Sequence, residues 1–169
     1  MKRQTPLPRL WLLSDERNDA QLAQALRRLP RGSGFIYRHY HLPTAQRRLR
    51  YEELRRLCRL RGIVLVLAGS QREARAWRAD AAYGRSGEVA TVHSLRELRR
   101  CTGARVALLS PVFPTQSHPG ATGLGPLRFL LLARQAALPV GALGGINRQT
   151  ARRIPGTAWA AINGLSGRA

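Results

Sequence analysis

Residues that could bind a polar or charged ligand are concentrated between positions 110 and 119, where the sequence reads SPVFPTQSHP. Thr115, Ser117 and His118 supply hydrogen-bonding groups, and the three prolines of the segment restrict the backbone that presents them. The loop continues to Gly125, before a helix expected at Pro126, and a loop of this length inside a compact domain is usually functional or disordered. We therefore interpret the segment as a binding loop, with a solvated loop interrupted by helix-breaking residues as the alternative.

Two glycine-containing turns offer a second kind of chemistry, the binding of phosphate by backbone amides. Gly144 and Gly145 follow an apolar run at 139–143, and Gly164 follows a similar run at 158–162. Glycine permits a positive φ and a close approach of the backbone to a ligand. Backbone N–H groups at such turns commonly hold phosphate in barrel proteins. A tight turn between strand and helix, without a ligand, is the alternative.

These loops must be positioned by regular elements, and the chain alternates short apolar runs with longer amphipathic segments. Helices are expected to begin near residues 19, 44, 71, 95, 126 and 147. The run at 63–68 is apolar throughout, which is typical of a strand buried on both faces of a parallel sheet. This alternation predicts an α/β fold. Eight strands are expected, at residues 10–13, 35–40, 63–68, 81–83, 89–93, 105–109, 139–143 and 158–162.

The fourth and fifth strands are separated only by residues 84–88, whereas a parallel crossover needs about a dozen residues. Either a helix is missing there or one of the two strands is misread. Eight strands predict one domain, residues 1–169, folded as an abbreviated TIM (β/α)8 barrel without the last helix and without the fourth. An open flavodoxin-like sheet, which needs fewer strands, is the alternative. In both folds ligands bind at the carboxyl ends of the strands.

The composition restricts the partners of the protein. The formal net charge is +20, with 29 Lys and Arg against 9 Asp and Glu, but the arginines are scattered rather than collected in one basic run with aromatic residues. This argues against nucleic-acid binding, which stays an alternative, and favours small anionic substrates. No uninterrupted apolar stretch is as long as a membrane-spanning helix requires, about 18 residues. The N-terminal apolar run is too short for a signal peptide, so a cytoplasmic protein is expected.

Some residues are interpreted as packing groups rather than ligand-binding groups. His93, at the end of the fifth strand, is expected to pack beside the following helix. Ile154 and Trp159 are expected to form an apolar flank, because a barrel without its last helix leaves apolar residues uncovered. This flank predicts that the protein forms a homo-oligomer.

Three motifs resemble those of the thiamine phosphate synthase/TenI family: SPVFPT at 110–115, ALGGI at 142–146 and AAIN at 160–163. The similarity is close over residues 89–164. It implies a TIM barrel and a transferase that joins a hydroxymethylpyrimidine diphosphate to a thiazole phosphate, forming thiamine phosphate. In the family, Mg2+ and basic groups hold the departing diphosphate, and the thiazole nitrogen captures a pyrimidine carbocation. The TenI branch places the histidine of a thiazole tautomerase where this chain has Pro111.

The resemblance implies a role for each matching residue. Arg38, on the second strand, and His118, in place of a lysine, would be the catalytic groups that hold the diphosphate. The substrates would be small phosphorylated molecules. The implied substrate-binding residues follow strands five to eight: Thr91, Thr115, Ser117, Gly144, Gly145, Ile162 and Asn163.

The resemblance also implies Mg2+, whose ligands the sequence does not identify. Magnesium prefers carboxylate oxygens, but the third strand ends in Ala68, Gly69 and Ser70, and no carboxylate follows the fourth strand before Glu88. Two functional hypotheses result. The first is a thiamine phosphate synthase-like enzyme. The second is a non-catalytic or regulatory protein that binds thiazole phosphate or thiamine phosphate.

Overall fold

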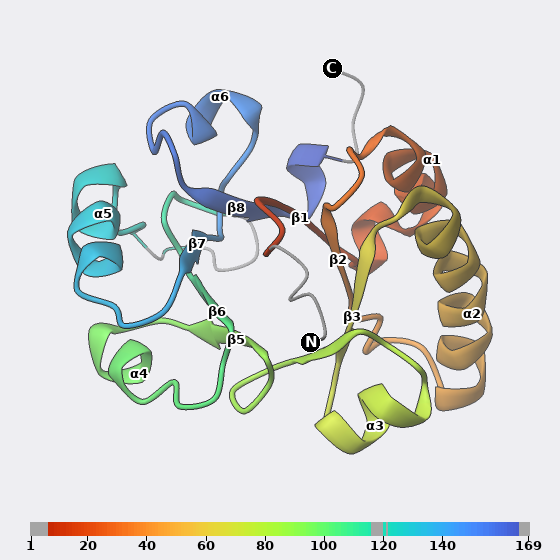
Figure 1. The fold of residues 1–169 in the computed structure, drawn as a ribbon. Coiled ribbons are helices and arrows are strands. Elements are labelled where there is room, and N and C mark those ends of the chain that lie inside the picture. The colour runs from red at the N-terminus through yellow and green to blue at the C-terminus, as the bar shows by residue number, and fades with distance from the viewer. Residues whose placement is uncertain (1–6, 116–119, 121, 166–169) are drawn as a thin grey trace.

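Eight parallel strands form a closed barrel in the computed structural model, which describes residues 7–115, 120 and 122–165 (Figure 1). The strands are β1 (Leu10–Leu13), β2 (Gly34–Tyr37), β3 (Val64–Ala68), β4 (Ala81–Tyr83), β5 (Val89–Val92), β6 (Val106–Leu109), β7 (Val140–Ala142) and β8 (Ala158–Ala161). They follow one another around the barrel in chain order, and β8 closes the ring by pairing with β1. The predicted α/β barrel is therefore confirmed, and the open-sheet alternative is wrong.

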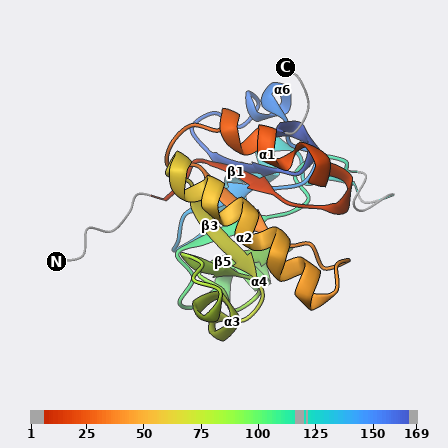
Figure 2. The same ribbon diagram turned by 90° about the vertical axis from the view of Figure 1, so that its right-hand side faces the viewer.

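Helices cover the outside of the barrel. They are α1 (Asp19–Arg28), α2 (Thr44–Arg61), α3 (Gln71–Ala76), α4 (Leu95–Arg99), α5 (Pro126–Arg134) and α6 (Arg148–Ala151), with short 3-10 helices η1 (Glu16–Asn18) and η2 (Asn163–Leu165). All six α-helices begin within one residue of the predicted positions. Helices α1 and α2 lie side by side over β1 to β3 (Figure 1 and Figure 2).

Apolar side chains fill both the interior of the barrel and the space between strands and helices. Successive residues of a strand point to opposite sides. In β1, Trp11 therefore packs with the strand residues inside the barrel, whereas Leu12 packs with the residues of α1 and α2. In β3, Val66 and Leu67 divide in the same way. Burial on both faces explains why the run at 63–68 carries no polar residue.

The junction between β4 and β5 has no helix, and both strands are present. Tyr83, the last residue of β4, pairs with Val89, the first residue of β5. Because β5 begins at the level where β4 ends, residues 84–88 only have to cross to the neighbouring strand. The prediction of a missing helix is therefore confirmed, and the alternative of a misread strand is wrong. Figure 1 shows α3 and α4 on either side of this short connection.

The structure differs from the apolar flank that the sequence predicts at Ile154 and Trp159. Ile154 is 1% exposed and packs against the core, while Trp159 is only partly buried. The largest exposed apolar side chains of the C-terminal half are instead Leu127 and Leu131, one turn apart on α5. The homo-oligomer stays a prediction. Among the described residues, no helix combines the length and the apolar character needed to cross a membrane.

Candidate active site

A cavity of about 1070 Å3 lies at the carboxyl ends of the strands. Seven of the nine site residues predicted from the sequence line this cavity, although they come from five different strand ends. The other two, Ser117 and His118, lie outside the described residues. The seven lining residues are Arg38, Thr91, Thr115, Gly144, Gly145, Ile162 and Asn163. The structure therefore places these residues together, while their individual roles stay predictions.

The wall of the cavity near β7 is made of backbone. Gly144 and Gly145 have φ values of 90° and 63°, and the loop after β6 lies directly against them. The N–H of Phe113 donates to the carbonyl oxygen of Gly144 at 3.0 Å, and a Cβ at position 145 would overlap the carbonyl oxygen of Pro114. These glycines are therefore required by packing as well as by any ligand. Since glycine has no side chain, only backbone atoms can contact a ligand here.

Replacing Gly145 by alanine should lower the free energy of unfolding by about 2–4 kcal/mol, because it adds backbone strain and a clash. Gly103→Ala is the matched control, since Gly103 has a φ of 83° and a Cβ added there would have no neighbouring atom within 4 Å. That control should cost about 1 kcal/mol through backbone strain alone. Urea unfolding of both variants measures the difference. Equal losses would show that the packing of the β6 loop on Gly145 does not stabilise the protein.

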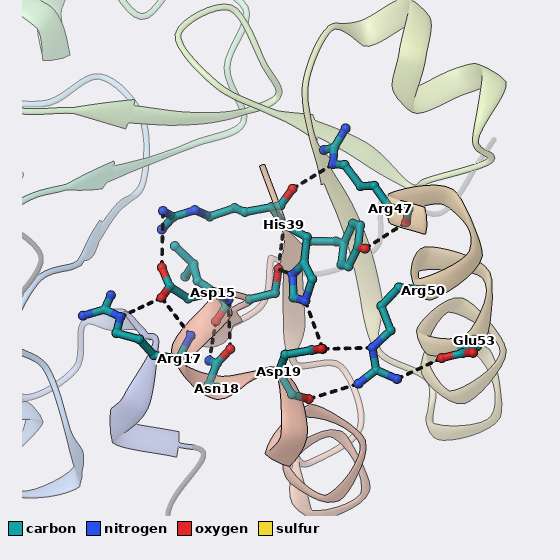
Figure 3. Close-up of polar contacts among 12 residues, drawn as sticks. Asp15, Arg17, Asn18, Asp19, His39, Arg47, Arg50 and Glu53 are labelled. Atoms are coloured by element: carbon teal, nitrogen blue, oxygen red, sulfur yellow. Dashed lines mark hydrogen bonds and ion pairs between the residues drawn. The ribbon is translucent and has the colours of Figure 1, made fainter. Parts of the chain in front are cut away.

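The backbone of Arg38 is held on both sides where β2 ends. Its N–H donates to Ser14 Oγ at 2.7 Å, and its carbonyl oxygen accepts a hydrogen bond from Arg47 Nε at 2.8 Å (Figure 3). The side chain lines the cavity, with a guanidinium nitrogen 3.7 Å from Asp15 Oδ2 and the guanidinium carbon 5.9 Å from the centre of the Tyr40 ring. The guanidinium is therefore directed into the cavity from a fixed backbone.

A buried polar chain supports this position from behind. His39 is 1% exposed and has a φ of 42°. Its Nδ1 lies 2.8 Å from Ser14 Oγ, and its Nε2 lies 3.0 Å from Asp19 Oδ1, which also accepts from Arg50 Nε at 2.9 Å (Figure 3). Burial lowers the pKa of His39 in spite of Asp19. Neutral His39 can donate from Nε2 to Asp19 and accept the Ser14 hydroxyl at Nδ1, which leaves the Ser14 oxygen to accept from Arg38.

This set of buried polar contacts was not predicted from the sequence. Ser14 follows β1 and His39 follows β2, and each stands beside another polar residue in the sequence, Asp15 and Arg38. Their residue types therefore gave no signal, and their pairing depends on the register of β1 with β2. Ser14 is fully buried. The Ser14, His39 and Asp19 arrangement therefore positions the backbone and does not present a nucleophile to the cavity.

Asp15 is the carboxylate that lies beside Arg38, and it is already neutralised. Arg17 Nε lies 2.6 Å from Asp15 Oδ1, and Arg38 lies on the side of Oδ2. The hydrogen bond from Arg17 lowers the pKa of Asp15. Asp15 therefore orients the two arginines at the edge of the cavity, and this part of the wall is cationic.

The residues of the cavity do not fit a magnesium site. Magnesium is usually held by one or two carboxylates together with substrate phosphates. The carboxylates lining the cavity are Asp15, which is occupied by Arg17, and the exposed Glu16. Within the described ranges, no group of three His, Cys, Asp or Glu residues could hold a metal ion.

The position of His93 differs from the one predicted from the sequence. It is exposed and lines the cavity, with Nδ1 3.0 Å from the carbonyl oxygen of Ser110. The packed histidine expected from the sequence is therefore wrong. Tyr40 and Tyr83 also line the cavity without having been predicted. Tyr83 ends β4 and Tyr40 follows Arg38 and His39 after β2. A tyrosine at either position could equally have been a core residue by type alone.

The closed barrel and its cavity define a (β/α)8-barrel protein with a cavity at the carboxyl ends of the strands, the end where proteins of this fold bind their ligands. Within this class, residues 89–166 match the family model described as thiamine monophosphate synthase. The fold is similar to that of thiamine phosphate pyrophosphorylase from Pyrococcus furiosus, with a TM-score of 0.77, 22% sequence identity, and coverage of 94% of this chain and 88% of that chain. No curated protein matches. The resemblance stated from the motifs is therefore confirmed.

Proposed function

We propose that this protein is a thiamine phosphate synthase-like transferase, which condenses hydroxymethylpyrimidine diphosphate with thiazole phosphate. The observation that carries the proposal is the composition of the cavity. Arg38 comes from outside the segment that matches the family model, and it lines the same cavity as Thr91, Thr115 and the Gly144–Gly145 turn from within that segment. A cation for a diphosphate thus lies in one space with a backbone turn suited to a second phosphate.

The proposed reaction needs positioning and charge stabilisation. The bond between the pyrimidine methylene carbon and the diphosphate oxygen breaks, and the diphosphate leaves with the electron pair. The thiazole nitrogen then donates its lone pair to that carbon and becomes positively charged. Arg38 would bind the developing negative charge of the diphosphate, and Thr115 with the backbone of Gly144 and Gly145 would hold the thiazole phosphate. No protein nucleophile is required.

A non-catalytic protein that binds thiazole phosphate or thiamine phosphate is the second candidate. The observation that favours it is the state of Asp15, which is paired with Arg17 and does not complete a magnesium site. An enzyme would then need another source of positive charge for the diphosphate.

Calorimetric titration with thiazole phosphate and with hydroxymethylpyrimidine diphosphate, each with and without Mg2+, followed by an assay for thiamine phosphate, tests the proposal. Binding of both ligands and formation of product are the expected results. Binding of thiazole phosphate alone, without product, would overturn the transferase and support the second candidate. Binding of neither ligand would contradict both.

A further inference from the structure

The pairing between β4 and β5 is short. β4 ends at Tyr83, whose partner is Val89, so β5 continues to Val92 beyond the level reached by β4. Thr91 lies in this part of β5, which has no partner in β4. It lines the main cavity and also a second cavity of about 550 Å3 beside α4. Thr91 therefore belongs to the lining of both cavities, and the second cavity lies beside β5 and α4, next to the connection where β4 and β5 have no helix between them.

Positive charge dominates the second cavity. Arg85, from the short connection after β4, faces it together with Arg96 and Arg100 from α4 and its end. All three are exposed, and in the part of the chain that the structure describes none of their guanidinium groups forms an ion pair or a side-chain hydrogen bond. The cavity is lined by three arginines and one carboxylate, Glu97.

The nearby carboxylates serve the backbone instead of the arginines. Glu97 Oε2 accepts the N–H of His93 at 2.8 Å, and Glu88 Oε2 accepts the N–H of Ala82 at 2.8 Å. By contrast, four arginines of α2 lie beside acidic partners, as in the pair of Arg48 with Glu52 at 2.6 Å. The excess positive charge at the second cavity is therefore not neutralised within the described chain.

We propose that this second cavity, called here the side cavity, is a metal-independent binding site for a diphosphate group. Three guanidinium groups can provide the charge and the paired N–H donors that a diphosphate requires. This site is separate from Arg38, which under the proposed function binds the diphosphate of the substrate in the main cavity. The inference therefore does not rest on the proposed function.

Calorimetric titration with inorganic diphosphate, in EDTA and about 0.15 M salt to screen long-range attraction, tests the site. The wild-type protein should bind without a divalent metal. The double variant Arg85→Gln/Arg96→Gln should bind about tenfold more weakly or worse, because two charge-assisted contacts are lost. The matched control Arg27→Gln/Arg28→Gln removes two exposed arginines of α1 and should retain the wild-type affinity.

Three results would overturn the proposal: binding only with Mg2+, no binding, or an equal loss in both double variants, which would indicate attraction by net charge alone. Thermal unfolding checks that the variants fold, and Arg100→Gln repeats the test with a single change if the double variant does not. Diphosphate binding at the side cavity without formation of thiamine phosphate would overturn the proposed function and leave this inference standing. Product formation with unchanged diphosphate binding in Arg85→Gln/Arg96→Gln would overturn this inference and leave the proposed function standing.

Discussion

Replacing Arg38 by glutamine should lower kcat/KM for thiamine phosphate formation by about a hundredfold to a thousandfold, the usual loss when one preorganised charge-stabilising group is removed. Arg38 lines the cavity, and its backbone is held through Ser14 and Arg47. The variant should remain folded, because the guanidinium is 3.7 Å from its partner Asp15 and the side chain is 27% exposed. Its free energy of unfolding should change by less than about 1 kcal/mol.

Two further variants separate a local effect from the loss of one charge. Arg38→Lys keeps the charge but not the bidentate geometry, so its activity should lie between those of the wild type and Arg38→Gln. Arg28→Gln removes one exposed arginine at the end of α1 and should leave kcat/KM unchanged. A loss of less than about tenfold in Arg38→Gln, at unchanged stability, would show that Arg38 does not stabilise the transition state.

Replacing Arg47 by alanine should lower the free energy of unfolding by about 3–5 kcal/mol, because three hydrogen bonds from one nearly buried guanidinium are lost. The Arg47 side chain is 11% exposed. Its three guanidinium nitrogens lie 2.8 Å from the Arg38 carbonyl oxygen, 3.0 Å from Glu73 Oε1 and 2.7 Å from the Ala68 carbonyl oxygen (Figure 3 shows the first of these). The guanidinium also packs over the Trp77 ring at 5.1 Å. One side chain therefore joins the ends of β2 and β3 to α3.

Urea unfolding measures this loss against Arg56→Ala, which removes an exposed arginine of the same helix and should cost less than about 0.5 kcal/mol. Arg47→Lys should recover less than half of the stability lost in Arg47→Ala. The single nitrogen of an ammonium group cannot replace the three nitrogens of the planar guanidinium, each of which donates to a different acceptor. Similar stabilities of Arg47→Ala and Arg56→Ala would mean that solvent replaces the contacts of Arg47 at little cost.

The fold could be predicted because its signals are local. The apolar run at 63–68 and the glycine Gly62 before it mark the end of a helix and the start of a buried strand within a few residues. The count of eight such strands was sufficient to distinguish a closed barrel from an open sheet. The short connection at 84–88 could be noticed but not explained, because the relative levels of β4 and β5 depend on strand register.

The site could be predicted where a residue's place follows from its strand. The carboxyl ends of all eight strands lie at one end of a barrel, so Thr91, Thr115 and the Gly144–Gly145 turn were expected at the same face before their distances were known. The exposure of His93 could not be predicted in this way. A histidine at a strand end can point into the cavity or pack beside a helix, and only the arrangement of its neighbours distinguishes the two.

The order of elements, the barrel and the face that carries the cavity thus follow from the sequence, because hydrophobic periodicity, helix caps and glycine turns act over a few residues. The contacts of Ser14 with His39 and of Arg47 with three elements were decided by the tertiary structure alone, as was the position of Arg85 at the cavity beside α4. These contacts join residues that are distant in the chain. Closure of the barrel brings them together. Helical spacing predicts some ion pairs within α2, such as Arg48 with Glu52, but no local pattern shows which of the 28 arginines will face a cavity.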